Sequence, residues 1–284
     1  MPIDPDRLRQ IAFPDIEQAY KPRDVMLYAL GIGLGQNNTD PHELAFVYER
    51  GLKVLPTYPA VLGFSPFMLR DLPTGIDFTR TVHGEERIEI HRPLPVQGHI
   101  VARTRLIDVI DKGAGKGALL LMERSIGDKA SGQALATITQ TVFCRGDGGF
   151  GPVRPSPPAH RVPERVPDLS CDLPTRSETA LIYRLSADLN PLHADPEAAK
   201  AAGFPRPILH GLASFGVAGH AILRCICDYD PARIAAIGGR FTAPVFPGET
   251  IRTEIWRDGS AVSFRARVKE RDAVAIDNGF VELQ

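Results

Sequence analysis

The sequence predicts an α+β protein built from two repeats, each an antiparallel sheet wrapped round a central apolar helix. A proline-rich stretch at residues 146–174 divides the 284-residue chain into two halves. In each half, an apolar segment precedes four strand-like runs, so the two halves share one order of elements. A bent antiparallel sheet must bury one face against another element, and the apolar segment of each half can provide it.

The first half, residues 1–146, is expected to form one repeat. A helical stretch is predicted near residues 24–33, and an apolar segment follows at 57–67. Apolar residues then predict strands near 87–91, 100–111, 118–126 and 135–144. Its segment RPLPVQG (92–98) resembles APVFPG (243–248) of the second half, and each lies between the first and second strand-like runs, which favours a duplication.

Residues 147–174 are predicted to be a linker between the two repeats. Proline fixes φ and lacks an N–H donor, so this density of prolines cannot pair in the interior of a sheet or sustain a helix. An extended linker is the favoured interpretation, and a meandering surface loop is the alternative. Each flank then has an ordinary domain size.

The second half, residues 175–284, forms the other predicted repeat. Asp195 is expected to cap a short helix that Gly203 ends. A longer helix at 212–227 carries an apolar stripe and is expected to be buried. Strands are predicted at 239–245, 250–257, 262–269 and 274–282, with a hairpin turn at Asp258 and Gly259.

The composition excludes several classes of protein. The 33 Lys and Arg residues balance 34 Asp and Glu residues, which excludes a strongly basic nucleic-acid clamp and an acidic disordered tail. No apolar run reaches the roughly 18 residues of a membrane span, and the first twenty residues do not resemble a signal peptide. Four cysteines do not make a disulfide scaffold. We therefore expect an intracellular protein without a nucleic-acid or membrane partner.

Asp188, Asn190 and His193 lie within six residues and carry the clearest chemical signal. Pro191 disfavours helical geometry at Asn190, and the resulting turn can direct Asp188 and His193 to one point. An acid and an imidazole that share one water form a proton-transfer pair. The alternative is that Asp and Asn only cap backbone groups. A calcium loop is excluded, because His193 and Ala199 stand where such a loop needs Gly and Glu.

Gly211 follows His210 at the predicted start of the long helix. The first N–H groups of a helix have no partner, and the helix dipole favours negative charge there. A thioester oxygen that gathers charge as an enolate could therefore bind at Gly211. The alternative is an ordinary glycine at a helix entrance.

These residues resemble the hydratase 2 motif of the MaoC-like (R)-specific enoyl-CoA hydratases. The resemblance includes residues 183–193, Ala198, Gly203, Phe204 and residues 207–211. The first half is similar to the two-repeat hydratases, which in eukaryotes form part of the peroxisomal multifunctional enzyme type 2. That similarity is carried by Tyr20, Arg23, Asp24, Leu27–Gly31, Val47–Glu49, Val54–Thr57, His83–Glu85 and Asp111–Gly113. The resemblance implies a double hot-dog fold.

The resemblance also implies a reaction, which is the reversible syn hydration of a trans-2-enoyl-CoA to a (3R)-3-hydroxyacyl-CoA. Asp188 and His193 would be the catalytic pair, with Asn190 as the motif Asn and Gly211 as the oxyanion donor. The expected substrate contacts are His83, Gly84, Lys112, Asp188, Leu189, Asn190, Pro191, Leu192, His193, Gly211 and Phe241. The CoA thioester is the substrate, and no metal or other cofactor is expected.

The first half lacks the motif, so only the second half is expected to be catalytic. The resemblance implies that the first half accommodates the acyl chain. Alternatives are a dehydratase of carrier-protein or branched 3-hydroxyacyl thioesters, a non-catalytic acyl-CoA-binding protein and a thioesterase. The chain ends Val-Glu-Leu-Gln without a Ser-Lys-Leu address, so we expect a stand-alone cytoplasmic enzyme. A homodimer follows from the resemblance.

Overall fold

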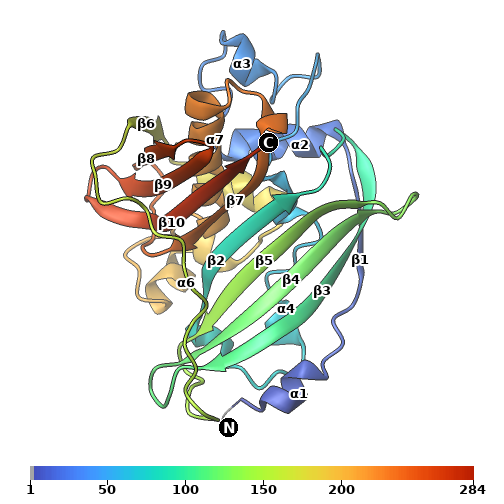
Figure 1. Ribbon diagram of the computed structural model, residues 1–284, viewed down its shortest axis with the longest axis vertical. Helices are drawn as coiled ribbons and strands as arrows, with labels where there is room; N and C mark the ends of the chain where they lie inside the picture. The colour runs from blue at the N-terminus through green and yellow to red at the C-terminus, as the bar shows by residue number, and fades with distance from the viewer. Residues whose placement is uncertain (1–2) are drawn as a thin grey trace.

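The computed structural model describes residues 3–284 and contains one ten-stranded antiparallel sheet (Figure 1). The first half contributes β1 (Ile16–Tyr20), β2 (Thr81–Ile90), β3 (Gly98–Asp111), β4 (Ala118–Asp128) and β5 (Ala134–Cys144). The second half contributes β6 (Leu169–Pro174), β7 (Ile234–Phe241), β8 (Thr250–Asp258), β9 (Ala261–Val268) and β10 (Ala273–Leu283). The strand order is β1-β3-β4-β5-β2-β7-β10-β9-β8-β6.

The strand order is the same in both halves when each is read from its outer edge. The order β1-β3-β4-β5-β2 matches β6-β8-β9-β10-β7, element for element. The two halves meet where β2 pairs antiparallel with β7, from Glu85 opposite Arg240 to Glu89 opposite Ala236. The guanidinium of Arg240 donates to the carboxylate of Glu85 across this seam at 2.6 Å. The predicted α+β fold of two repeats is therefore confirmed.

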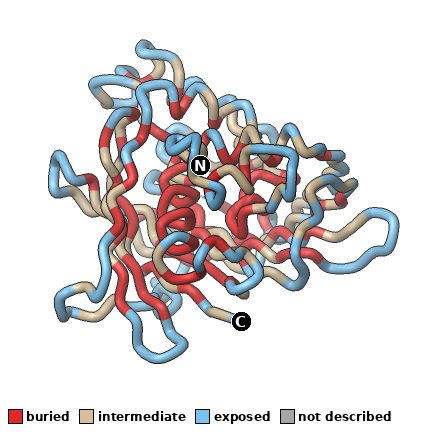
Figure 2. Tube along the Cα trace, turned by 90° about the horizontal axis from the view of Figure 1, so that it is seen from above, coloured by how far each residue is buried: buried red, intermediate tan, exposed pale blue. Residues whose placement is uncertain are grey.

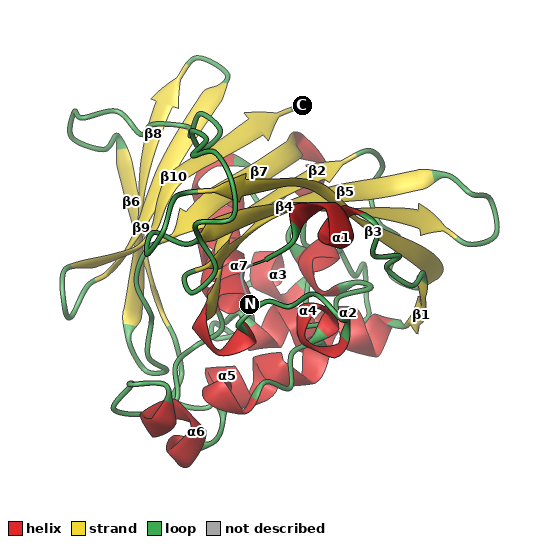
Figure 3. Cartoon of the chain, turned by 90° about the horizontal axis from the view of Figure 1, so that it is seen from below, coloured by secondary structure: helices red, strands yellow, loops and turns green. Residues whose placement is uncertain are grey.

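Helix α7 (Gly211–Ile226) is the longest helix of the described residues, and it is buried almost all round. Thirteen of its sixteen residues are buried, because the sheet curves around one side and shorter helices cover the other (Figures 2 and 3). The remaining α-helices are α1 (Pro5–Arg9), α2 (Pro22–Gly31), α3 (Pro41–Leu44), α4 (Met68–Asp71), α5 (Thr179–Tyr183) and α6 (Pro196–Ala201). No helix within residues 3–284 is both long and apolar enough to cross a membrane.

The apolar segment of the first half is shorter than a central helix. It forms only the 3₁₀ helix η1 (Tyr58–Val61). Pro56 and Pro59 lack N–H donors, and Gly63 adopts φ +58°. A Cβ on Gly63 would lie 2.1 Å from the Cβ of Ala102, so the chain passes against β3 here. This close approach replaces the long helix that the second half retains.

Four strands differ from the sequence prediction, and one of them, β2 (Thr81–Ile90), begins six residues before the predicted 87–91. The edge strands β1 and β6 are short and were not predicted, and β6 occupies the last six residues of the proline-rich segment. Pro174 is tolerated there because an edge strand needs hydrogen bonds on one side only. Strand β7 spans Ile234–Phe241, which is earlier than the predicted 239–245, and prolines 244 and 247 follow it.

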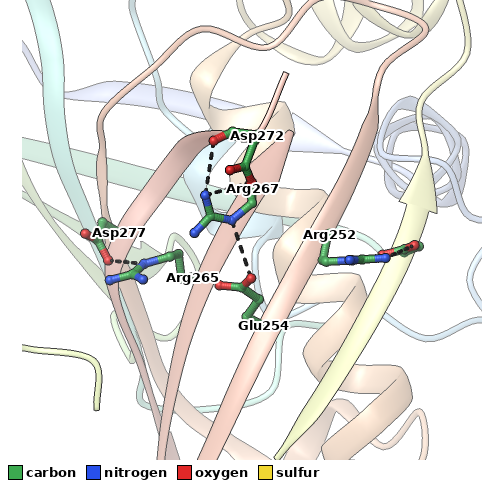
Figure 4. Close-up of polar contacts among 7 residues, drawn as sticks. Arg252, Glu254, Arg265, Arg267, Asp272 and Asp277 are labelled. Carbon is green, nitrogen blue, oxygen red and sulfur yellow. Dashed lines mark hydrogen bonds and ion pairs between the residues drawn. The ribbon is translucent and has the colours of Figure 1, made fainter. Parts of the chain in front are cut away.

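The proline-rich segment crosses the face of the sheet opposite α7. The indole of Trp256 donates to the carbonyl of Arg165 at 2.7 Å, and His160 Nε2 lies 2.8 Å from Ser263 Oγ. The same face carries a ladder of ion pairs, most of them half-buried (Figure 4). Its pairs are Arg252–Asp172, Arg267–Glu254, Arg267–Asp272 and Arg265–Asp277. Partly exposed pairs of this kind contribute about 1 kcal/mol or less each.

Gly216 is the point where α7 packs most closely against the first half. A Cβ there would lie 2.6 Å from Cγ2 of Ile32 and 3.0 Å from the hydroxyl of Tyr28, both buried. We expect Gly216→Ala to lower the free energy of unfolding by about 1–3 kcal/mol through overpacking, although alanine favours a helix by about 1 kcal/mol. Urea titration measures this change. Arg224→Ala, at an exposed position of α7, is the control and should change little; an unchanged Gly216→Ala protein would contradict the packing.

Candidate active site

A cavity of about 400 Å³ lies between the two halves and is lined by both. The first half contributes side chains from β2 to β5 and from the segment around α4. The second half contributes the turn that holds Asp188 and His193, the start of α7, the end of β7 and the loop after it. The predicted catalytic turn of the second half therefore faces a cavity whose other wall comes from the first half.

Two consecutive side-chain turns shape the segment after the 3₁₀ helix η3 (Arg184–Ser186). Asp188 Oδ1 accepts the N–H of Asn190 at 3.0 Å, and Asn190 Oδ1 accepts the N–H of Leu192 at 3.1 Å. Asn190 thereby caps the 3₁₀ helix η4 (Pro191–His193). The capping interpretation is thus correct for Asp188 Oδ1 and for Asn190 Oδ1. It leaves Asp188 Oδ2 and the amide NH₂ of Asn190 for other partners.

His193 is buried, with 7% of its surface exposed, and its orientation is fixed by the backbone. Its Nδ1–H donates to the carbonyl of Ile208 at 2.9 Å, which leaves the lone pair on Nε2. Nε2 lies 4.0 Å from Asp188 Oδ2. Burial lowers the pKa of His193, while the Ile208 carbonyl and the charge of Asp188 oppose this effect. The two atoms are too far apart for a direct hydrogen bond, but one water can bind both.

His210 supports this pair and was not predicted as a site residue. Its ring stacks on that of His193, with centroids 3.7 Å apart, and its Nε2–H donates to the backbone carbonyl of Asp188 at 3.1 Å. Burial, and then the neighbouring His193, lower the pKa of His210 to about 2. A neutral His210 therefore holds the backbone that presents Asp188. The signal in the sequence was its position directly before Gly211.

Gly211 is the first residue of α7 and lines the cavity. Its N–H belongs to the first turn, where no intrahelical acceptor exists. A Cβ on Gly211 would lie 3.3 Å from the ring of Phe241, which in turn forms a T-shaped contact with the ring of His83, with ring centroids 4.8 Å apart. Backbone donor, aromatic ring and imidazole thus surround one part of the cavity.

The predicted substrate contacts divide into two groups. Those that line the cavity are His83, Asp188, Asn190, Leu192, His193, Gly211 and Phe241. Gly84, Lys112, Leu189 and Pro191 do not line it. Gly84 sits at a register shift in β2, and Lys112 Nζ donates to Ser156 Oγ at 2.9 Å in the proline-rich segment. Leu189 is exposed.

The wall from the first half contains polar residues that the sequence analysis did not single out. Arg124 and Gln140 line the cavity from β4 and β5, together with Thr104 from β3. In β4, Arg124 interrupts an alternating series of buried residues: Ala118, Leu120, Met122 and Ile126. The signal in the sequence was a charged residue at a position where the alternation of the strand predicts a buried apolar residue.

Asp188, His193 and His210 could also supply metal ligands, since one ligand atom of each lies within 4.8 Å of the others. The lone pairs of an imidazole lie in the ring plane, and the two stacked rings face each other instead of converging edge to edge. This arrangement suits proton transfer better than metal binding. The expectation of a metal-free site stays a prediction.

Comparisons with known proteins cover nearly the whole chain. Residues 158–278 match the family described as "MaoC like domain", and residues 18–146 match "MFE-2 hydratase 2 N-terminal domain". The chain is 41% identical over 303 residues to "Enoyl-CoA hydratase 2, peroxisomal" of Arabidopsis thaliana, covering 98% of this chain and 95% of that protein. It is 42% identical over 294 residues to "3-hydroxyacyl-thioester dehydratase Y" of Mycobacterium tuberculosis, covering 99% of each. The solved structure of a MaoC-like dehydratase from Phytophthora capsici is similar with a TM-score of 0.86 and 35% identity, covering 99% of this chain and 98% of that one.

The buried histidines make stability depend on pH. Burial lowers the pKa of His210 from 6.5 to about 2 in the native protein, so only the unfolded state binds its proton as the pH falls below 6.5. This difference removes about 1 kcal/mol of stability between pH 6.5 and about 5.5. We expect His210→Gln to make the decline in unfolding free energy shallower by that amount. Urea titrations at several pH values measure it, with exposed His99→Gln as the control; an unaltered slope would contradict the burial of His210.

Proposed function

Because the chain belongs to the MaoC-like hydratase 2 family, whose members are hydro-lyases, we propose that it hydrates trans-2-enoyl-CoA reversibly to (3R)-3-hydroxyacyl-CoA. One observation supports this proposal above the others. Asp188 Oδ2 and His193 Nε2 lie 4.0 Å apart in a cavity that begins at the N-terminus of α7. A water between these atoms can donate to both.

The substrate thioester is proposed to bind with its carbonyl oxygen at the N–H of Gly211. The helix dipole and the unpaired donor stabilise the negative charge that this oxygen gathers as an enolate forms. Withdrawal of electrons toward this oxygen makes C3 of the enoyl group electrophilic. The ring of Phe241 lies against Gly211 and can confine the thioester in this position.

Water addition then proceeds between Asp188 and His193. The water oxygen bonds to C3, and Nε2 of neutral His193 accepts one water proton. The electron pair of the double bond moves to the enolate, and the Asp188–His193 pair delivers a proton to C2 from the same face. The addition is therefore syn. The amide of Asn190 is proposed to orient the water, and no step requires a metal or redox cofactor.

The two repeats are proposed to have different roles in the reaction. The second repeat, 175–284, carries the catalytic turn, and the first repeat, 1–146, provides the wall along the acyl chain. His83 and Leu192 would contact the substrate inside the cavity, with Gly84, Leu189 and Pro191 shaping its surroundings. Lys112 lies outside the cavity and is proposed to meet the phosphates of CoA, since it is a cation on a long stem.

A dehydratase acting on other 3-hydroxyacyl thioesters is the second candidate. It is favoured by the 42% identity to a protein named as a 3-hydroxyacyl-thioester dehydratase. The chemistry is the same reaction in reverse, so the site geometry is equally suitable. Rates with CoA-bound, carrier-bound and branched substrates separate the two candidates.

We expect Asp188→Asn and His193→Ala to reduce hydration by at least about a hundredfold, the lower range of acid–base contributions. Loss of absorbance of the conjugated enoyl thioester measures the rate, and chiral analysis of the product gives its configuration. His99→Gln, at an exposed position of β3, is the control and should retain activity. Near-normal rates in either folded variant, or an exclusively (3S) product, would contradict the assignment. Release of free thiol without hydration would indicate a thioesterase instead.

We also propose that the enzyme is a cytoplasmic homodimer. Leu30 of α2 and Leu181 of α5 are exposed on helices that pack together, and Leu185 is exposed in the adjacent η3. Exposed apolar side chains on neighbouring helices favour an interface between copies. Light scattering is expected to give twice the chain mass of 31.0 kDa, and Leu181→Glu to shift it toward one chain. A monomer at all concentrations would contradict the dimer. Localisation of the tagged protein in the source cells tests whether the enzyme is cytoplasmic.

A further inference from the structure

The cavity contains a buried charge that the proposed reaction does not use. Arg124 lies on β4, is only 6% exposed and lines the cavity from the first half. Its neighbours on the same face of β4, Met122 and Ile126, are buried and apolar. A guanidinium is rarely placed on such a face without a partner, because burial of an unpaired charge is costly.

The hydrogen-bonding capacity of Arg124 is mostly unused. Nη2 donates to the carbonyl of Ala60 at 2.9 Å, while Nε is buried without a partner. No carboxylate of residues 3–284 lies within 4.0 Å of the guanidinium. The ring of Phe64, also in the cavity wall, lies 5.4 Å from the guanidinium carbon. Since arginine has several N–H donors, the side chain retains donors for a ligand.

Glu86 balances the charge of Arg124 without satisfying its donors. The Glu86 residue is 2% exposed, and its Oε2 accepts a hydrogen bond from His83 Nε2 at 3.0 Å. Burial lowers the pKa of Arg124, and the charge of Glu86 opposes that effect. Arginine stays protonated in proteins, so the two side chains form a nearly neutral buried set. An uncharged acceptor therefore suits this place better than a second anion.

Two further polar side chains extend this part of the wall. Thr104 lies directly opposite Arg124 in the β3–β4 ladder, and Gln140 lies opposite Glu86 in the β2–β5 ladder. Both line the cavity. Thr104, Arg124 and Gln140 thus form a polar belt on the wall of the first repeat, which also carries apolar residues such as Phe78 and Val142.

We propose that this polar belt selects acyl chains that carry an uncharged oxygen, as a hydroxyl or keto group, which accepts a hydrogen bond from Arg124. The inference rests on the proposed function only in placing the acyl chain along the first repeat. Hydrogen bonds to charged groups contribute about 1.5–3 kcal/mol, which corresponds to roughly 10- to 150-fold in affinity. A plain hydrocarbon chain leaves these donors unpaired.

Calorimetric titration with saturated acyl-CoAs tests the proposal without turnover. The series has one chain length and includes the unsubstituted chain, hydroxyl and keto groups at successive carbons beyond C3, and a terminal carboxylate. Position C3 is left out because a 3-hydroxyacyl-CoA is the proposed product and would turn over. We expect at least one hydroxyl or keto isomer to bind about tenfold more tightly than the unsubstituted chain. Equal binding throughout would overturn the proposal, and so would tightest binding of the carboxylate, which would indicate an anion site.

Replacement of Arg124 identifies the donor. Arg124→Met combined with Glu86→Gln removes both charges, and the preference for the oxygenated isomer should disappear while the unsubstituted chain still binds. Arg103→Met is the control, since Arg103 is exposed on β3 and pairs with Asp15. A preference that persists in the double variant would mean that Arg124 only holds Ala60, and would overturn the proposal. The wild-type titration decides the matter if the double variant does not fold.

Turnover of the matching trans-2-enoyl-CoAs separates this inference from the proposed function. Hydration of every substrate at equal kcat/KM, together with equal binding, overturns the selection of oxygenated chains and leaves the hydratase activity intact. Selective binding without hydration supports the polar belt and contradicts the proposed reaction. Selective binding with a raised kcat/KM for the same isomer supports both.

Discussion

The burial of α7 is the constraint on which the rest of the molecule depends. Thirteen of its sixteen residues are buried, so the helix is stable only when sheet and helices enclose it on all sides. Enclosure fixes the position of its first residue, Gly211, whose N–H has no intrahelical acceptor. The cavity begins at this end of the helix. Packing of an apolar helix therefore decides where negative charge can be stabilised, and the turn that holds Asp188 and His193 lies beside that point.

Much of this architecture could be predicted, because its causes are local. Residue alternation indicated the long strands, Pro191 indicated the turn between Asp188 and His193, and the family and hydro-lyase class inferred from these residues are confirmed. The edge strands β1 and β6 were missed because short edge strands carry little alternation, and prolines masked β6. The role of His210 and the environment of Arg124 arise from contacts between distant segments, which spacing along the chain does not encode. The catalytic roles themselves stay predictions.

The duplicated strand order allows the two repeats to serve different purposes. The second repeat keeps a long helix and the turn with the acid and the imidazole. In the first repeat a 3₁₀ helix and a loop around Gly63 replace the long helix, so less of its concave face is filled by its own chain. Part of the cavity occupies that face, and residues such as Thr104 and Gln140 line it.

The pairing of β2 with β7 makes the two repeats a single sheet. Separation of the repeats would leave the backbone donors and acceptors along this line without partners, on strands that also form cavity walls. Neither repeat can be replaced on its own without exposing β2 or β7 as an unpaired edge strand that is prone to aggregate. The two repeats therefore have to stay together in one chain. Substitutions can accumulate in either repeat only where they leave the pairing of β2 with β7 intact.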